Sequence, residues 1–297
     1  MKIDTHQHYW RYQPADFPWI NDAMPVLQRD CLPADVLPAM QVAGVDAVVA
    51  VQARSGPTET DDLLALARSN PQIVGVVGWT DLTSPAIEDV LDAYRGQPLL
   101  KGFRHILQDE PNLSAVVRNP DFSRGVKALQ KRGLVYDVLV FDRQITSVID
   151  FCARHNQHWL VLDHVGKPCV RDWATRSEVP GRWLASITAL AAMPHVVCKL
   201  SGLVTEADWS AGKGIQPQDA KVMLECLDRA LDLFGPNRIL YGSDWPVCQL
   251  AAPYEAVHGL VQRWANTRLT HQEQEAFWSV NAMRCYQLAV PVRAPST

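Results

Sequence analysis

Several features that mark other classes of protein are missing from this sequence of 297 residues. No apolar run approaches the ~20 residues of a membrane-spanning helix. No cluster of basic residues occurs, and 28 Lys and Arg stand against 32 Asp and Glu, a formal charge of −4. The sequence therefore predicts neither nucleic acid nor a membrane as a partner.

Paired cysteines are missing too. Seven cysteines are scattered over positions 31, 152, 169, 198, 226, 248 and 285, without any Cys-x-x-Cys. This usage is typical of small buried side chains in a reducing compartment, not of disulfides or zinc knuckles. The first residues, Met-Lys-Ile-Asp-Thr-His, contain no apolar signal region, so we expect a cytoplasmic protein.

Two common enzyme motifs are also absent. Without a Gly-x-Ser-x-Gly elbow, a serine esterase of the α/β-hydrolase fold is disfavoured. Without a Gly-x-Gly-x-x-Gly or phosphate-binding loop, a nucleotide cofactor is disfavoured as well. No low-complexity segment or Ser/Gly linker divides the chain, so we expect one domain over residues 1–297.

What the chain does contain is a short run of Val, Ile or Leu followed by a helical pattern, repeated eight times. The predicted strands cover residues 2–8, 45–53, 73–80, 99–106, 134–141, 158–165, 195–202 and 238–245. Helical patterns lie between them, including 59–69, 86–95, 144–155, 182–192, 218–234 and 254–267, and a last amphipathic segment covers 271–287. Apolar strands that alternate with helices indicate a parallel sheet covered on both faces. Eight units favour an α/β fold of the (β/α)₈ TIM barrel type over an open doubly wound sheet.

Loop lengths differ between the two ends of this predicted barrel. Helix-to-strand connections are short and carry Gly or Pro, as at Gly44 and Gly133. Strand-to-helix connections are long, at about residues 9–31, 106–120, 166–180 and 203–217. Long loops at the carboxyl ends of the strands are typical of a barrel whose active site lies there.

Polar residues gather where the predicted strands end. His6 and His8 end the first strand, and their spacing of two puts both imidazoles on one face. Further candidates end the later strands: Arg104 and His105 the fourth, Asp163 and His164 the sixth, Lys199 and Ser201 the seventh, and Asp244 the eighth. This convergence is the expected signature of a barrel active site.

These residues occur in longer motifs that resemble those of a known family. Asp4-Thr5-His6-x-His8 and Gly242-Ser243-Asp244-Trp245-Pro246 resemble motifs of the amidohydrolase superfamily. Lys101-Gly102-Phe103-Arg104-His105, Leu162-Asp163-His164-x-Gly166-Lys167-Pro168 and Lys199-Leu200-Ser201-Gly202 look like its sugar-lactonase branch, the L-fuconolactonase- and L-rhamnonolactonase-like proteins. The 2-pyrone-4,6-dicarboxylate lactonases are more distant relatives of this branch. The resemblance runs from residue 2 to the final helix and implies hydrolysis of a sugar lactone to the free sugar acid.

The resemblance also bears on metal content. Superfamily members with two metals carry a bridging Lys or Glu on the fourth strand and a His at the end of the fifth. The fifth strand here contains Asp137 and no His, so a binuclear centre is not expected. One divalent ion, with zinc favoured, fits the donor set His6, His8, His164 and Asp244.

The lactonase cousins are thought to need no metal, and cationic side chains polarise the carbonyl instead. Arg104 and Lys167 supply such cations here, so both versions stay open, and we favour activity that survives chelation. In either version, Asp244 is the expected base that activates water. A metal on the histidine cluster, or His6, His8, His164 and Arg104 as donors, would stabilise the oxyanion.

Tryptophan is concentrated at the predicted mouth. Six of ten lie at strand ends or in long loops: Trp10, Trp19, Trp79, Trp173, Trp209 and Trp245. Indole faces suit the C–H surfaces of sugars, which favours a compact polyhydroxylated ligand. The expected substrate-binding residues are His105, Lys167, Trp10, Trp79, Trp245 and Ser201. The expected partner is a small-molecule sugar lactone, and a homo-oligomer is compatible with the sequence.

Two other functions remain open. A metal-dependent decarboxylase of the same superfamily also uses His-x-His, a sixth-strand His and an eighth-strand Asp. A non-catalytic sugar-binding barrel would need no base, and the intact set of Asp244 and histidines argues against it.

Overall fold

The computed structural model describes residues 1–210 and 214–289 and confirms the (β/α)₈ TIM barrel. Its eight strands are β1 (Ile3–Gln7), β2 (Ala47–Val51), β3 (Ile73–Gly78), β4 (Leu100–His105), β5 (Val135–Val138), β6 (Leu160–Leu162), β7 (Val196–Leu200) and β8 (Ile239–Tyr241). They pair in parallel and in chain order, and a bridge from Gln7 to Trp245 joins the last strand to the first. Every predicted strand is present, each within its predicted range.

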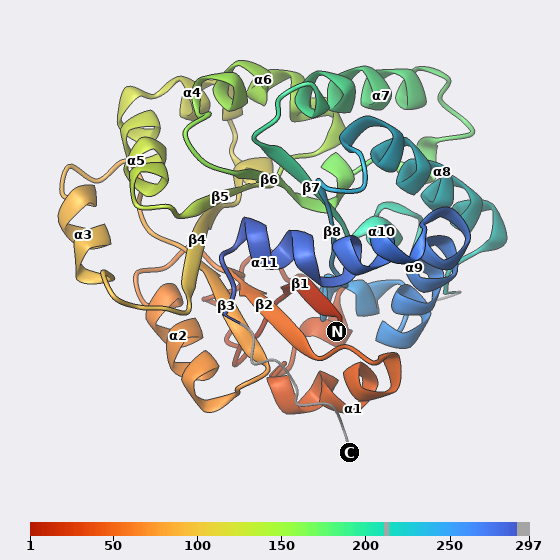
Figure 1. Cartoon of the computed structure of the whole chain (residues 1–297), viewed down its shortest axis with the longest axis horizontal. Helices are drawn as coiled ribbons and strands as arrows, with labels where there is room; N and C mark the ends of the chain where they lie inside the picture. Colours follow the sequence, from red (N-terminus) through yellow and green to blue (C-terminus); the bar gives the residue numbers. More distant parts are fainter. Residues whose placement is uncertain (211–213, 290–297) are drawn as a thin grey trace.

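Helices surround the sheet (Figure 1). They are α1 (Pro33–Ala43), α2 (Glu59–Ser69), α3 (Ile87–Ala93), α4 (Leu113–Arg118), α5 (Pro120–Lys131), α6 (Ile145–Arg154), α7 (Glu178–Ala191), α8 (Pro217–Phe234) and α9 (Tyr254–Arg268). The sequence patterns specified neither α1 nor the pair α4 and α5, and α4 lies inside the segment 106–120 expected as a loop. Asn112 and Asn119 begin these two helices, because each side chain accepts a hydrogen bond from a backbone N–H of the first turn.

The hydrophobic core consists of two apolar clusters. The larger one packs the outer faces of the strands against the helices. The smaller one fills the barrel interior with residues that alternate along the strands, such as Val135, Val161, Val197 and Leu240. Two residues after Val135, Val161 and Val197 the side chains are charged, at Asp137, Asp163 and Lys199.

The amino-terminal end of the barrel is closed by the final segment of the described chain. The predicted helix 271–287 is present as α10 (His271–Glu275), a single π turn (Ala276–Val280) and α11 (Asn281–Cys285). Figure 1 shows α11 lying across the barrel opening. Its residues Ala282 and Cys285, with the following Tyr286, belong to the interior cluster. The segment around α11 thus closes the barrel at the end opposite to the carboxyl ends of the strands.

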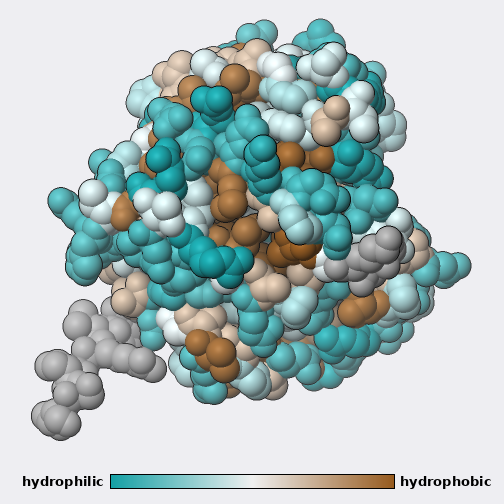
Figure 2. Space-filling view, turned by 90° about the vertical axis from the view of Figure 1, so that its right-hand side faces the viewer, coloured by the Kyte–Doolittle hydropathy of each residue, from teal (hydrophilic) through white to brown (hydrophobic). Residues whose placement is uncertain are grey.

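None of the helices in 1–210 and 214–289 has the length and apolarity needed to cross a bilayer. Figure 2 views the side where α7, α8 and α9 lie, which is mostly hydrophilic, with apolar residues gathered in a central hollow. The large apolar residues that are exposed are scattered along the described chain, for example at Val42, Leu184 and Val280.

Candidate active site

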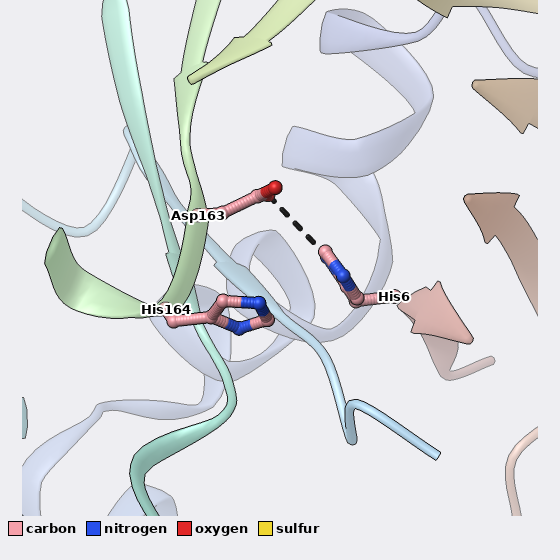
Figure 3. Close-up of side chains that lie close together, drawn as sticks. All are labelled: His6, Asp163 and His164. Atoms are coloured by element: carbon pink, nitrogen blue, oxygen red, sulfur yellow. Dashed lines mark ion pairs between the residues drawn. The ribbon is translucent and has the colours of Figure 1, made fainter. Parts of the chain in front are cut away.

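The carboxyl ends of β1, β6 and β8 bring three histidines and an aspartate together. His8 Nε2 lies 3.3 Å from Asp244 Oδ1, His6 Nε2 lies 3.7 Å from it, and His164 Nε2 lies 3.9 Å from it. All four side chains are buried. Figure 3 shows His6 reaching from β1 toward Asp163, with His164 beside it. The structure therefore groups three predicted site histidines around the carboxylate of a fourth predicted residue, Asp244.

The backbone around these residues is tightly constrained. Asp244 and His164 both have positive φ, at 62° and 54°, an uncommon conformation for residues other than glycine. Gly202 must be glycine, because a Cβ there would lie 2.4 Å from Nδ1 of His164. A Cβ on Gly242 would lie 2.8 Å from the Cβ of His6. The glycines of the Ser201-Gly202 and Gly242-Ser243 motifs therefore make room for the imidazoles.

Hydrogen bonds fix the direction of two of the imidazoles. Nδ1 of His8 lies 2.8 Å from the carbonyl oxygen of Val51, a pure acceptor, so Nδ1 carries the proton. Nε2 of His8 then faces Asp244 at 3.3 Å and His6 at 3.2 Å. Nδ1 of His164 is 3.0 Å from the hydroxyl of Ser201. Ser201 thus supports His164 from behind.

A ring of buried charges lies beneath this cluster, and we call it the charge layer: Arg104, Asp137, Asp163 and Lys199. Nζ of Lys199 is 2.5 Å from Asp137 and 3.2 Å from Asp163. One guanidinium nitrogen of Arg104 donates to Asp163 at 3.0 Å and lies 3.2 Å from Nε2 of His6. Gln52 accepts from Nε of Arg104 at 2.8 Å and holds the guanidinium in place. Two cations and two carboxylates thus balance one another inside the barrel.

The electrostatics of the site follow from burial and from these neighbours. Burial lowers the pKa of His6 and of His164 well below the usual value. Burial opposes the ionisation of Asp244, but His164, His8 and the charge of Lys167 outweigh it and lower its pKa. Burial also opposes the ionisation of Asp163, where Lys199 and other neighbours lower the pKa further still. Asp244 is therefore a carboxylate at neutral pH.

A cavity of about 230 Å³ opens above the cluster. Its polar lining comprises His8, Arg104, Gln108, Asp109, His164, Lys167 and Asp244, and its apolar lining comprises Trp19, Met24, Ala53, Ile106, Leu139 and Val247. Trp19 and Met24 belong to the long loop after β1, and the indole of Trp19 donates to Ala53 at 2.9 Å. A larger hollow of about 420 Å³ lies beside Lys101 at the opposite end of the barrel, away from this chemistry. The smaller cavity is the candidate substrate site.

The structure distinguishes between two neighbouring residues on β4. Arg104 faces the barrel interior and lines the cavity, whereas the side chain of His105 leaves the barrel. His105 pairs with Glu110 at 2.6 Å and packs against Phe122. His105 is therefore not among the residues that line the cavity, although we expected it to bind substrate.

The three tryptophans expected to bind substrate also lie outside the cavity lining. Trp10 is buried against Phe17 and Trp19, and Trp245 is buried against Tyr9. The backbone of Trp79 is hydrogen-bonded to Thr60 at the start of α2. Ser201 lies behind His164, and Lys167, which pairs with Glu206 at 3.1 Å, lines the cavity as expected. Trp19 is the indole that the described structure places in the lining.

Sequence reasoning missed the charge layer as a unit. Asp137, Asp163 and Lys199 were noticed only as members of strands or motifs. Their signal was period-two alternation, since each stands two residues after an interior valine, on the same strand or, for Asp163, directly after it. A charged residue at an interior barrel position needs a partner of opposite charge, and the neighbouring strands supply it.

The chain belongs to the amidohydrolase family, whose model matches residues 3–288. An L-fucono-1,5-lactonase of Burkholderia multivorans is 51% identical over 294 residues, covering 99% of this chain and 98% of that protein. An L-fucono-1,5-lactonase of Burkholderia ambifaria is 33% identical, covering 85% of this chain and 83% of that protein. A crystal structure of a Burkholderia multivorans amidohydrolase with bound zinc has a TM-score of 0.93 at 52% identity, covering 97% of this chain and 100% of that one. The resemblance drawn from the motifs is confirmed.

The donor set fits one divalent metal ion. His6, His8 and Asp244 offer ligand atoms that all lie within 4.8 Å of one another, and all three residues are buried. Because Nδ1 of His8 donates to Val51, Nε2 is the ring nitrogen of His8 that would bind a metal. His6, Asp163 and His164 form a second overlapping group. In that group, Asp163 is placed to orient His6 as carboxylates commonly orient metal-bound histidines.

Proposed function

We propose that this protein hydrolyses a sugar lactone, with L-fucono-1,5-lactone as the first candidate, to the free sugar acid. The observation that carries the proposal is the grouping of the Asp244 carboxylate with three buried imidazoles at the base of a cavity of about 230 Å³. The two lactonases among its relatives support the same reaction for this chain. A decarboxylase or a non-catalytic barrel is not favoured.

Asp244 is proposed as the general base. Its carboxylate is ionised at neutral pH and lines the cavity, so it can accept a proton from a water molecule as that water attacks the lactone carbonyl. Collapse of the tetrahedral intermediate breaks the bond between the acyl carbon and the ring oxygen. The proton held by Asp244 then passes to that oxygen, which leaves as a hydroxyl. No covalent intermediate is needed.

Arg104 is proposed as the principal electrophile. Its guanidinium lines the cavity and is held rigidly by Gln52 and Asp163, so it can donate to the developing oxyanion without reorganisation. His164 also lines the cavity beside it. Nδ1 of His8 is used by Val51, so only Nε2 of His8 can face the substrate or a metal.

His6, His8 and Asp244, with His164 beside them, are proposed to hold one zinc ion. When bound, such an ion would polarise the carbonyl as a Lewis acid or lower the pKa of a water molecule. Arg104 already places a positive charge 3.2 Å from Nε2 of His6. We therefore expect Arg104 to sustain activity after chelation.

The cavity lining supports a substrate with one polar face and one apolar face. Gln108, Asp109 and Lys167 can bind hydroxyl groups, and the buried side-chain oxygen of Gln108 has no hydrogen-bond partner in the described structure. Met24 and Leu139 offer an apolar surface suited to the terminal carbon of a deoxy sugar. We propose that Lys167 binds substrate, because it lines the cavity. Substrate binding by His105, Ser201, Trp10, Trp79 and Trp245 stays a prediction, and these residues lie outside the cavity lining.

Proton release in weak buffer tests the proposal. A panel of 1,4- and 1,5-lactones of six-carbon and deoxy sugar acids should yield acid, and γ-butyrolactone should be a poor substrate, because remote hydroxyl contacts position the carbonyl. Consumption of protons with release of CO₂ from an aromatic acid would identify a decarboxylase instead. Equal turnover of γ-butyrolactone and the best sugar lactone would contradict the proposed substrate class.

A further inference from the structure

A continuous chain of contacts joins the floor of the barrel to His6. The hydroxyl of Tyr286, directly after α11, lies 3.1 Å and 3.2 Å from the two carboxylate oxygens of Asp137. Asp137 accepts from Nζ of Lys199 at 2.5 Å, and the same Nζ lies 3.2 Å from Nδ1 of His6. Every side chain in this chain of contacts is buried.

These contacts reach the active site at the Nδ1 atom of His6. It lies between two competing groups: the ammonium of Lys199 at 3.2 Å, which can only donate, and Asp163 Oδ1 at 3.3 Å, which accepts. A proton on Nδ1 leaves a lone pair on Nε2, and a proton on Nε2 removes it. The position of Lys199 therefore decides which ring nitrogen of His6 carries the proton.

The second ring nitrogen of His6, Nε2, points toward the proposed base and the proposed electrophile. Its Nε2 lies 3.2 Å from His8, 3.2 Å from Arg104 and 3.7 Å from Asp244. His6 itself is not among the residues that line the cavity. A change in its tautomer would alter the base and the electrophile while leaving the substrate contacts in place.

Tyr286 has no access to the substrate, so its effect must pass through other residues. It does not line the active-site cavity. Its ring lies 5.4 Å from Nζ of Lys199, and its hydroxyl restrains the carboxylate that holds that ammonium. Removal of the hydroxyl would take away this restraint on Asp137, which is the nearest carboxylate to Nζ of Lys199.

We propose that Tyr286 is a positioning residue that fixes Asp137 and Lys199 and, through them, the tautomer and orientation of His6. This role rests on the proposed hydrolase function of the same site. It assigns a catalytic consequence to the last helical segment, which closes the opposite end of the barrel from the cavity.

Tyr286→Phe is the test variant because it removes one hydroxyl and keeps the ring. Tyr136→Phe is the matched control, since Tyr136 is equally buried but its ring packs outside the barrel against Phe122 and Phe151. The measurements are kcat and KM on the best lactone, Tm, and the imidazole ¹⁵N shifts of His6 in histidine-labelled protein. A His6→Asn sample assigns the His6 signals.

We expect Tyr286→Phe to lower kcat by about tenfold, as is usual for partners that orient a histidine, with KM within twofold of wild type. The His6 ¹⁵N signals should shift, while Tyr136→Phe leaves both kcat and these signals unchanged. A kcat equal to that of the control, or a loss of kcat with unchanged His6 signals, would overturn the positioning role. If the wild-type protein turns over no lactone, the proposed function fails, and the ¹⁵N shifts alone decide this inference.

Discussion

Gly202 offers the sharpest structural perturbation of the site, because its substitution acts on one imidazole. Gly202 has a φ of 62°, and an added Cβ would lie 2.4 Å from Nδ1 and 2.6 Å from Cγ of His164. The ring must retreat by about 1 Å before this contact reaches an ordinary 3.4 Å. That movement breaks the hydrogen bond between His164 and Ser201.

The magnitude of the Gly202→Ala effect has two parts. The left-handed backbone costs a residue with a Cβ about 1–2 kcal/mol, and the lost hydrogen bond adds about 1 kcal/mol. We therefore expect the free energy of unfolding to fall by about 2–3 kcal/mol. A displacement of this size at a catalytic group lowers kcat by roughly 10²-fold.

Gly44→Ala separates the backbone effect from the clash. Gly44 ends α1 with a φ of 67°, and nothing lies within 4 Å of the Cβ that alanine would add. It should lose about 1–2 kcal/mol of stability in urea unfolding and keep the wild-type kcat. A Gly202→Ala protein with wild-type kcat, or equal losses of kcat in both variants, would refute the reasoning.

Two further predictions concern charge. Arg104→Met should lower kcat by about 10²–10³-fold, the range for removal of one oxyanion donor, while chelated wild-type enzyme keeps its rate; the opposite pattern of initial rates would assign the electrophile to the metal. Burial and the neighbouring Lys2 lower the pKa of His258 to about 4. The unfolded chain therefore binds the proton more tightly, so stability is lost as pH falls from about 6.5 through 4. His258→Gln should reduce the difference in unfolding free energy between pH 7.5 and pH 5 by about 1–2 kcal/mol, and an unchanged difference in urea titrations would count against this assignment.

The strands were predictable because their patterns are local. Buried parallel strands contain continuous Val, Ile and Leu, and eight such runs leave little choice of architecture. The helix α4 was missed because its six residues carry too few turns for a clear period. Its cap at Asn112 was the available signal.

The sequence predicted which residues lie at the strand ends. It predicted less well which of two adjacent side chains points into the cavity. Arg104 and His105 are adjacent in sequence, yet alternation sends one into the barrel and the other out of it. Trp10 lies in an expected loop and Trp245 at an expected strand end, but their rings are buried against other aromatic side chains instead of lining the cavity. Such packing depends on partners distant in sequence, which a single strand pattern does not contain.

The general-base role of Asp244 is tested most directly by the initial rate of proton release from L-fucono-1,5-lactone by Asp244→Asn. The amide keeps the shape of the side chain but cannot accept the proton of the attacking water, so the rate should fall by about 10²–10⁴-fold relative to wild type. Unchanged Tm and unchanged binding of the product acid would locate the loss in the chemical step. An Asn variant that keeps more than about a tenth of the wild-type rate would contradict the assignment of Asp244 as the base.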